Sequence, residues 1–170
     1  MNMMPQALQK KVCVLGGFSV GKTSLIRRYV ESIFSESYIT TVGVKIDKKT
    51  LDLAGRLVSL ILWDVAGEDD MAAFRMTYLR GAAGYLLVAD GTRPATLDVA
   101  LSLRERVEAA CGPLPCALLV NKNDLTEEWT ISGTDLEGLR QKGWWVRPTS
   151  ARTGEGVEDA FKDLAVRVSS

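Results

Sequence analysis

Hydrophobic and polar positions alternate along the chain between two patterns. Short, mostly apolar runs bounded by glycine or polar residues predict strands, and segments with apolar residues every three or four positions predict helices. The strands are predicted at residues 11–16, 42–53, 57–65, 84–90, 116–121 and 144–149. The helices are predicted at residues 23–30, 72–82, 95–110, 134–142 and 156–168. Strands and helices therefore follow one another in nearly regular alternation.

This alternation predicts an α/β fold with three layers, in which about five helices cover a six-stranded, mostly parallel sheet. The runs at 84–90 and 116–121 are almost wholly apolar, as expected of central parallel strands that are covered on both faces. The segments 42–53 and 57–65 are joined by the short connection Ala54-Gly55-Arg56, which favours an antiparallel hairpin. We expect this to be the one antiparallel pair.

Length and composition indicate a single ordinary globular domain. We expect residues 11–168 to form that domain and residues 1–10 to be a flexible N-terminal segment. The 21 Lys and Arg residues balance 21 Asp and Glu residues, so no overall positive field favours nucleic acid as a partner.

Cysteine usage and the chain ends predict a cytoplasmic protein. Cys13, Cys111 and Cys116 form no CxxC pair, and the chain has no histidine, so we interpret them as reduced thiols rather than zinc ligands. The sequence has no signal peptide, no long apolar span and no lipidation motif. We therefore expect no membrane anchor within the chain itself.

The segment Gly16-Gly17-Phe18-Ser19-Val20-Gly21-Lys22-Thr23 matches the pattern G-x-x-x-x-G-K-[ST] between a predicted strand and a predicted helix. Such a loop turns successive backbone N–H groups toward one point at the positive end of a helix, where phosphate binds. Lys22 would add a charge at the β- and γ-phosphates, and the Thr23 hydroxyl would ligate Mg²⁺. The alternative is an ordinary glycine-rich turn followed by a surface lysine. Nucleotide contacts are expected from Gly16, Phe18, Ser19, Val20, Gly21, Lys22, Thr23 and Ser24.

Two later loops favour guanine as the base. Asn121-Lys122-Asn123-Asp124 follows an apolar strand directly, at the end where open α/β sheets bind ligands. The Asp124 carboxylate can accept from guanine N1–H and the 2-amino group, and the Lys122 stem can cover the ring. Ser150-Ala151-Arg152 lies on the same sheet edge, and its N–H groups could contact guanine O6. The alternatives are a polar turn for the first loop and a helix-initiating turn for the second.

The segments GGFSVGKTS, TTVGV, WDVAGED, NKND and PTSARTGEGVEDAF, in this order over residues 16–161, resemble the five nucleotide-binding boxes of Ras-superfamily small GTPases. In character they are most similar to Rab proteins or to the G domain of Roco proteins. The resemblance implies GTP or GDP as ligand, Mg²⁺ as cofactor and GTP hydrolysis. It also implies protein effectors, an exchange factor and an activating protein as partners.

The resemblance assigns further residues to the nucleotide. Thr41, with Thr40 as the alternative, resembles the threonine that coordinates Mg²⁺ and touches the γ-phosphate. Asp64 resembles the residue that holds Mg²⁺ through water, and the Gly67 N–H resembles a donor to the γ-phosphate. Phe34 stands where the family often has an aromatic residue edge-on against guanine, but it could also be a surface aromatic.

Those γ-phosphate contacts exist only before hydrolysis, so segments 33–44 and 66–76 are expected to relax afterwards and to form the effector surface. The expected catalytic residues are Lys22, Thr41, Gly67 and Glu68.

Glu68 is the main departure from the family pattern, which usually has glutamine there to orient the attacking water. A carboxylate facing a γ-phosphate meets like-charge repulsion, so we expect slow hydrolysis. The alternative is a guanine-nucleotide-binding module that does not hydrolyse GTP. Phe18 stands where Ras itself has glycine, and its bulk would crowd an incoming arginine finger. Arg75 and Arg80 are expected to be exposed helix charges.

Overall fold

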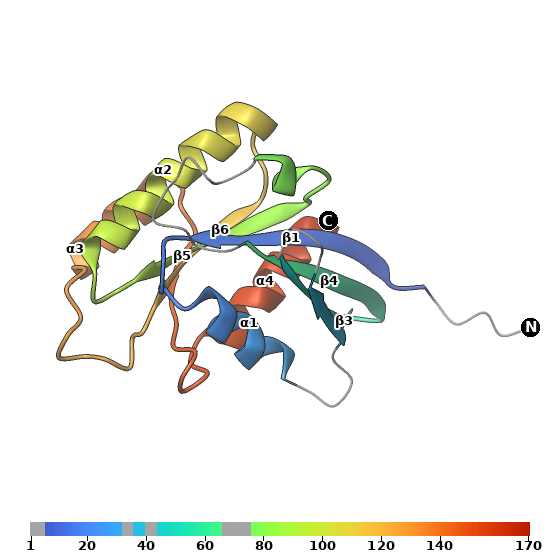
Figure 1. Cartoon of the computed structure of the whole chain (residues 1–170), viewed down its shortest axis with the longest axis horizontal. Helices are drawn as coiled ribbons and strands as arrows, with labels where there is room; N and C mark the ends of the chain where they lie inside the picture. Colours follow the sequence, from blue (N-terminus) through green and yellow to red (C-terminus); the bar gives the residue numbers. More distant parts are fainter. Residues whose placement is uncertain (1–5, 32–35, 40–43, 66–75) are drawn as a thin grey trace, which may run out of the picture.

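The computed structural model describes residues 6–31, the backbone of 36–39, and residues 44–65 and 76–170. Figure 1 shows one sheet with helices on both faces. The strands are β1 Leu8–Gly16, β2 Glu36–Ile39, β3 Lys45–Leu53, β4 Arg56–Asp64, β5 Gly84–Asp90, β6 Cys116–Asn121 and β7 Val146–Pro148. The helices are α1 Lys22–Val30, α2 Pro94–Cys111, α3 Gly133–Gln141 and α4 Val157–Ser169, with a 3₁₀ helix, η2, at Met76–Leu79.

The sheet has the order β2-β3-β4-β1-β5-β6-β7. Strands β4, β1, β5, β6 and β7 run parallel, and β3 pairs antiparallel with β4 as the short hairpin connection predicts. The predicted three-layer α/β fold is therefore confirmed.

Three details differ from the sequence prediction. Strand β2 is an additional edge strand and makes a second antiparallel pair with β3, so β3 and β4 are not the only such pair. Its sequence, Glu-Ser-Tyr-Ile, has no apolar run that would signal a strand. Strand β1 begins at Leu8, because residues 8–10 continue the pairing with β4, so these residues are part of the sheet and not of a flexible segment. Within the predicted helix 72–82, the described part forms only the short η2.

Two hydrophobic layers hold the helices to the sheet. Helices α1 and α4 pack on one face, where the rings of Tyr29 and Phe161 stack 4.1 Å apart. Helices α2 and α3 pack on the other face with η2. All seven residues of β5 are buried, as expected of a central strand covered on both sides. The Cys13 thiol is also buried and donates to the Tyr78 carbonyl oxygen at 3.3 Å.

This topology brings the carboxyl ends of β1, β5 and β6 to one edge of the sheet. Asp90 at the end of β5 is paired with Asn121 at the end of β6, and Gly16 ends β1 beside β5. The segments that the sequence singles out therefore leave the sheet side by side. Within the described parts of the chain, no helix is long and apolar enough to span a bilayer.

Candidate functional site

The loop between β1 and α1 has a backbone that depends on its glycines. Gly21 has φ 102° and immediately precedes α1, and Ser19 also has a positive φ, 57°. A Cβ atom on Gly21 would lie 2.3 Å from Asn121 Nδ2, and one on Gly16 would lie 2.5 Å from the Val88 carbonyl oxygen. Close approach therefore disfavours a larger side chain at both positions, and at Gly21 the left-handed backbone angle disfavours it as well.

Lys22 folds back over this loop. Its ammonium group donates to the carbonyl oxygens of Gly16 at 3.1 Å and Gly17 at 3.0 Å, and the residue is 6% exposed. Burial lowers the pKa of Lys22 to about 8, although the nearby Asp64 carboxylate opposes the shift. The site thus holds a poorly solvated cation that would gain from an anionic ligand.

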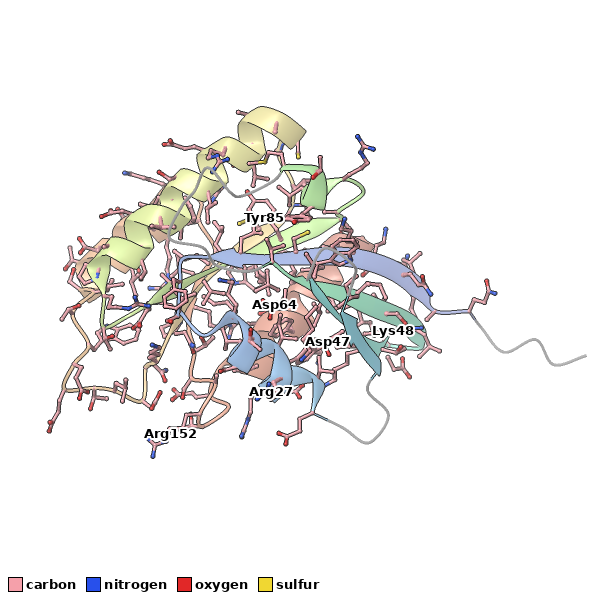
Figure 2. All side chains as sticks on the ribbon, in the orientation of Figure 1. Arg27, Asp47, Lys48, Asp64, Tyr85 and Arg152 are labelled. Carbon is pink, nitrogen blue, oxygen red and sulfur yellow. The ribbon has the colours of Figure 1, made fainter. Side chains whose placement is uncertain are left out.

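Thr23 and Asp64 bring two oxygen ligands together next to Lys22. The Thr23 hydroxyl donates to Asp64 Oδ2 at 2.6 Å, which joins the start of α1 to the end of β4. Figure 2 labels Asp64, close to α1. Hydroxyl and carboxylate oxygens are the donors that Mg²⁺ prefers. In the part of the chain that the structure describes, no group of three or more His, Cys, Asp or Glu side chains could hold a metal. A cation here would therefore need further oxygens from a ligand, from water or from other residues.

A cavity of about 640 Å³ lies over this loop. It is lined by three lysines and one aspartate among its ten residues, so its charge favours an anion. The lining residues are Phe18, Ser19, Val20, Gly21, Lys22, Thr23, Ser24, Lys45, Asp64 and Lys122.

Asn121 ties three loops together behind the cavity. Its amide donates to the Val20 carbonyl oxygen at 3.0 Å. Its Oδ1 accepts from the Thr149 hydroxyl at 3.3 Å and from the Ala151 N–H at 3.2 Å. Because Asn121 is 2% exposed, these bonds are shielded from water.

A second cavity of about 570 Å³ adjoins the first, and Gly21, Ser24 and Lys122 line both. At this cavity the Ser150 hydroxyl donates to Asp124 Oδ1 at 2.8 Å. Arg152 Nη1 lies 4.0 Å from Asp124 Oδ2, but its side chain is 82% exposed and projects outward in Figure 2. The other lining residues are Arg27, Arg28, Glu31, Asn121, Asp124, Leu125, Ala151 and Arg152.

The 150–152 loop differs from the prediction in one respect. The Ser150 N–H donates to the Glu155 carbonyl oxygen at 3.0 Å and the Ala151 N–H to Asn121, so both are engaged within the protein. Ser150 is buried and acts through its hydroxyl, which holds the Asp124 carboxylate at the cavity. The loop is a separate turn and precedes α4, which begins only at Val157.

Several predicted residues lie outside the described part of the chain, namely Phe34, Thr40, Thr41, Gly67, Glu68 and Arg75. Phe18 is described and is 57% exposed, and Arg80 is exposed as predicted. Sequence reasoning missed Asp90 and Arg93. Asp90 is linked to the loop of residues 16–24 through Lys122, and Arg93 contacts that loop directly. Their only signal is an aspartate that ends an otherwise apolar strand at the expected ligand edge.

Comparison with known proteins agrees with this arrangement. The model of the Ras family matches residues 11–170. The human Ras-related protein Rab-32 is 32% identical over 168 residues, covering 93% of this chain and 74% of that protein. The Dictyostelium discoideum Ras-related protein Rab-4 is 33% identical over 153 residues, covering 89% of this chain and 75% of that protein. The chain is therefore a Rab-like member of the Ras family, the small GTPases that act as GTP-binding regulatory switches.

Proposed function

We propose that the chain binds GTP and GDP with Mg²⁺ in the two joined cavities and hydrolyses GTP slowly. The observation that carries this proposal is the continuity of the cavities. A lysine-rich cavity at the start of α1 suits phosphates, and it shares Gly21, Ser24 and Lys122 with a cavity that Asp124 lines. A guanine nucleotide likewise carries its phosphates at one end and its hydrogen-bonding base at the other.

The phosphates would occupy the loop of residues 16–24. Backbone N–H groups at the start of α1 and the Lys22 ammonium would bind the β- and γ-phosphate oxygens. Lys22 now donates to the neutral carbonyl oxygens of Gly16 and Gly17. Anionic phosphate oxygens would be stronger acceptors and would replace these carbonyls as its partners.

Guanine would be read by Asp124, which accepts from N1–H and the 2-amino group, while the Lys122 stem covers the ring. The Ser150 hydroxyl holds one Asp124 oxygen in place and thereby orients the carboxylate. Phe34, the Arg152 backbone and Ala151, which lines the cavity, would complete the base site.

Mg²⁺ would be held by the Thr23 hydroxyl, by Asp64 and by Thr41, and it would neutralise the phosphate charge that develops during transfer. The 2.6 Å bond between Thr23 and Asp64 supports this assignment, because it brings two hard oxygen ligands beside the phosphate cavity. Thr41 and the Gly67 N–H would contact the γ-phosphate. Segments 33–44 and 66–76 would then recruit effectors, an exchange factor and an activating protein in a nucleotide-dependent way.

Glu68 supports a slow intrinsic rate. A carboxylate next to the γ-phosphate is repelled by it, so it would orient water less well than an amide. The same residue favours a second candidate function, a guanine-nucleotide-binding module that does not hydrolyse GTP.

Nucleotide selectivity tests the binding proposal. Nucleotide-free protein should bind GDP and GTP tightly in the presence of Mg²⁺ and should not bind ATP in calorimetric titrations. Asp124→Ala should weaken GDP binding, whereas the matched control Asp98→Ala, at an exposed position on α2, should leave it unchanged. Equal affinity for ATP and GTP, or an unaffected Asp124→Ala variant, would overturn the proposed base site.

A further inference from the structure

Asp90 is a buried carboxylate at the carboxyl end of β5, and only 1% of its side chain is exposed. It accepts from the N–H and the hydroxyl of Thr92 at 2.9 and 2.6 Å. It also pairs with two cations, Arg93 Nε at 3.0 Å and Lys122 Nζ at 2.7 Å. Burial alone would raise the pKa of Asp90, but these bonds outweigh it and hold the pKa at about 2.

Both cations reach beyond Asp90 to the loop that we assign to the phosphates. Arg93 Nη2 donates to the Phe18 carbonyl oxygen at 2.8 Å, and Lys122 Nζ donates to the Ser19 carbonyl oxygen at 3.1 Å. One buried carboxylate is therefore linked through two side chains to two consecutive carbonyl groups of the loop.

Holding these carbonyls fixes the direction of the following N–H groups. In a trans peptide the C=O and the next N–H point in opposite directions. When the Phe18 and Ser19 carbonyls point at the cations, the N–H groups of Ser19 and Val20 point the other way. Ser19 and Val20 line the phosphate cavity, where such donors bind phosphate.

We propose that Asp90, Arg93 and Lys122 form a clamp that fixes the phosphate loop in its binding conformation, with Arg93 as a positioning residue for nucleotide retention. This inference rests on the proposed function. The loop needs such support because two of its residues, Ser19 and Gly21, have left-handed backbone angles, and glycines offer many alternative conformations in a free loop. Ordering the loop before the nucleotide arrives lowers the entropy cost of binding.

Arginine suits the position because its planar guanidinium presents several donors in a fixed fork. Nε contacts Asp90 while Nη2 contacts the Phe18 carbonyl, so one group bridges the end of β5 and the loop. A lysine there could keep the ion pair with Asp90 but could not span both partners with the same geometry.

The competing explanation is that Arg93 only stabilises the start of α2, since it immediately precedes that helix. The two roles differ in what they do to nucleotides of different phosphate number. A clamp on Phe18 and Ser19 acts on the part of the loop that meets the outer phosphates. It should therefore affect GDP and GTP and should spare GMP.

The test measures release of radiolabelled GDP and GTP, and GMP affinity by competition, for wild type, Arg93→Gln, Arg93→Lys and the control Arg104→Gln. Arg104 lies within α2, pairs with Glu108 at 2.8 Å and lines neither cavity. Arg93→Gln should release GDP and GTP about tenfold faster, as expected for one lost charge-assisted hydrogen bond, with GMP affinity unchanged. Arg93→Lys should behave like Arg93→Gln, and Arg104→Gln like wild type.

The inference is wrong if Arg93→Gln releases GDP as slowly as the control. It is also wrong if GMP and GDP weaken equally, or if Arg93→Lys matches wild type, because the Phe18 contact is then irrelevant. Its failure is separable from failure of the proposed function. In the latter case the wild-type protein would not bind GDP at all.

Discussion

Asn121→Ala should destabilise the fold itself, apart from any effect on ligand binding. The wild-type side chain makes three hydrogen bonds, to the Val20 carbonyl, the Thr149 hydroxyl and the Ala151 N–H, of which the first two are buried and the third is partly buried. Each such bond contributes about 1 kcal/mol, so the change should lower the free energy of unfolding by about 3 kcal/mol. For a domain of this size that corresponds to a fall in Tm of about 6–12 °C.

Thermal and urea unfolding of the nucleotide-free protein in EDTA would measure this loss. Nucleotide must be absent, because a ligand that binds only the folded state adds its own stabilisation. Asn123→Ala is a matched control, since the Asn123 side-chain oxygen is buried with no hydrogen-bond partner among the described residues. If Asn121→Ala were no less stable than Asn123→Ala, the idea that Asn121 joins the three loops would be refuted.

Three further predictions follow from the same site. Gly21→Ala should weaken GDP binding about 5- to 30-fold in a titration, which is what 1–2 kcal/mol of left-handed strain implies. Its Cβ would also displace the Asn121 amide, and unchanged affinity would contradict the geometry. Lys22 has a pKa of about 8 in the free protein, and a bound phosphate should raise that pKa. GDP binding should therefore take up protons near pH 8–9 but not at pH 6. Calorimetry in buffers of different ionisation enthalpy measures the proton uptake, which Lys22→Met should abolish. The pKa of Asp90 is lowered from 3.8 to about 2, so this carboxylate should contribute about 2 kcal/mol of stability above pH 4. That contribution should be lost as the pH falls toward 2. Urea unfolding across this pH range should show the loss in wild type and not in Asp90→Asn.

Where the sequence predicted structure well, a local pattern was sufficient. Strands at 84–90 and 116–121 match β5 and β6 to the residue, because their apolar runs end abruptly at Asp90 and Asn121. The loop from Gly16 to Thr23 was predicted from its motif, and its bonds to Asp64 and Asn121 agree with that reading.

Where prediction failed, the deciding contacts come from distant parts of the chain. Strand β2 forms only because β3 offers it a free edge, and its own sequence carries little signal. Asp90 and Arg93 gain their roles from Lys122 and Phe18, which are far away in sequence. A charged residue that ends an apolar strand at the ligand edge is the signal that would have identified Asp90.

Single-turnover conversion of bound GTP to GDP tests the central claim most directly. Purified protein loaded with GTP and Mg²⁺ should form GDP slowly, and Glu68→Gln should change the rate, because an amide is not repelled by the γ-phosphate. If GTP binds but persists unchanged in both proteins, the chain binds guanine nucleotides without hydrolysing them, and the proposal that it is a slow GTPase is contradicted.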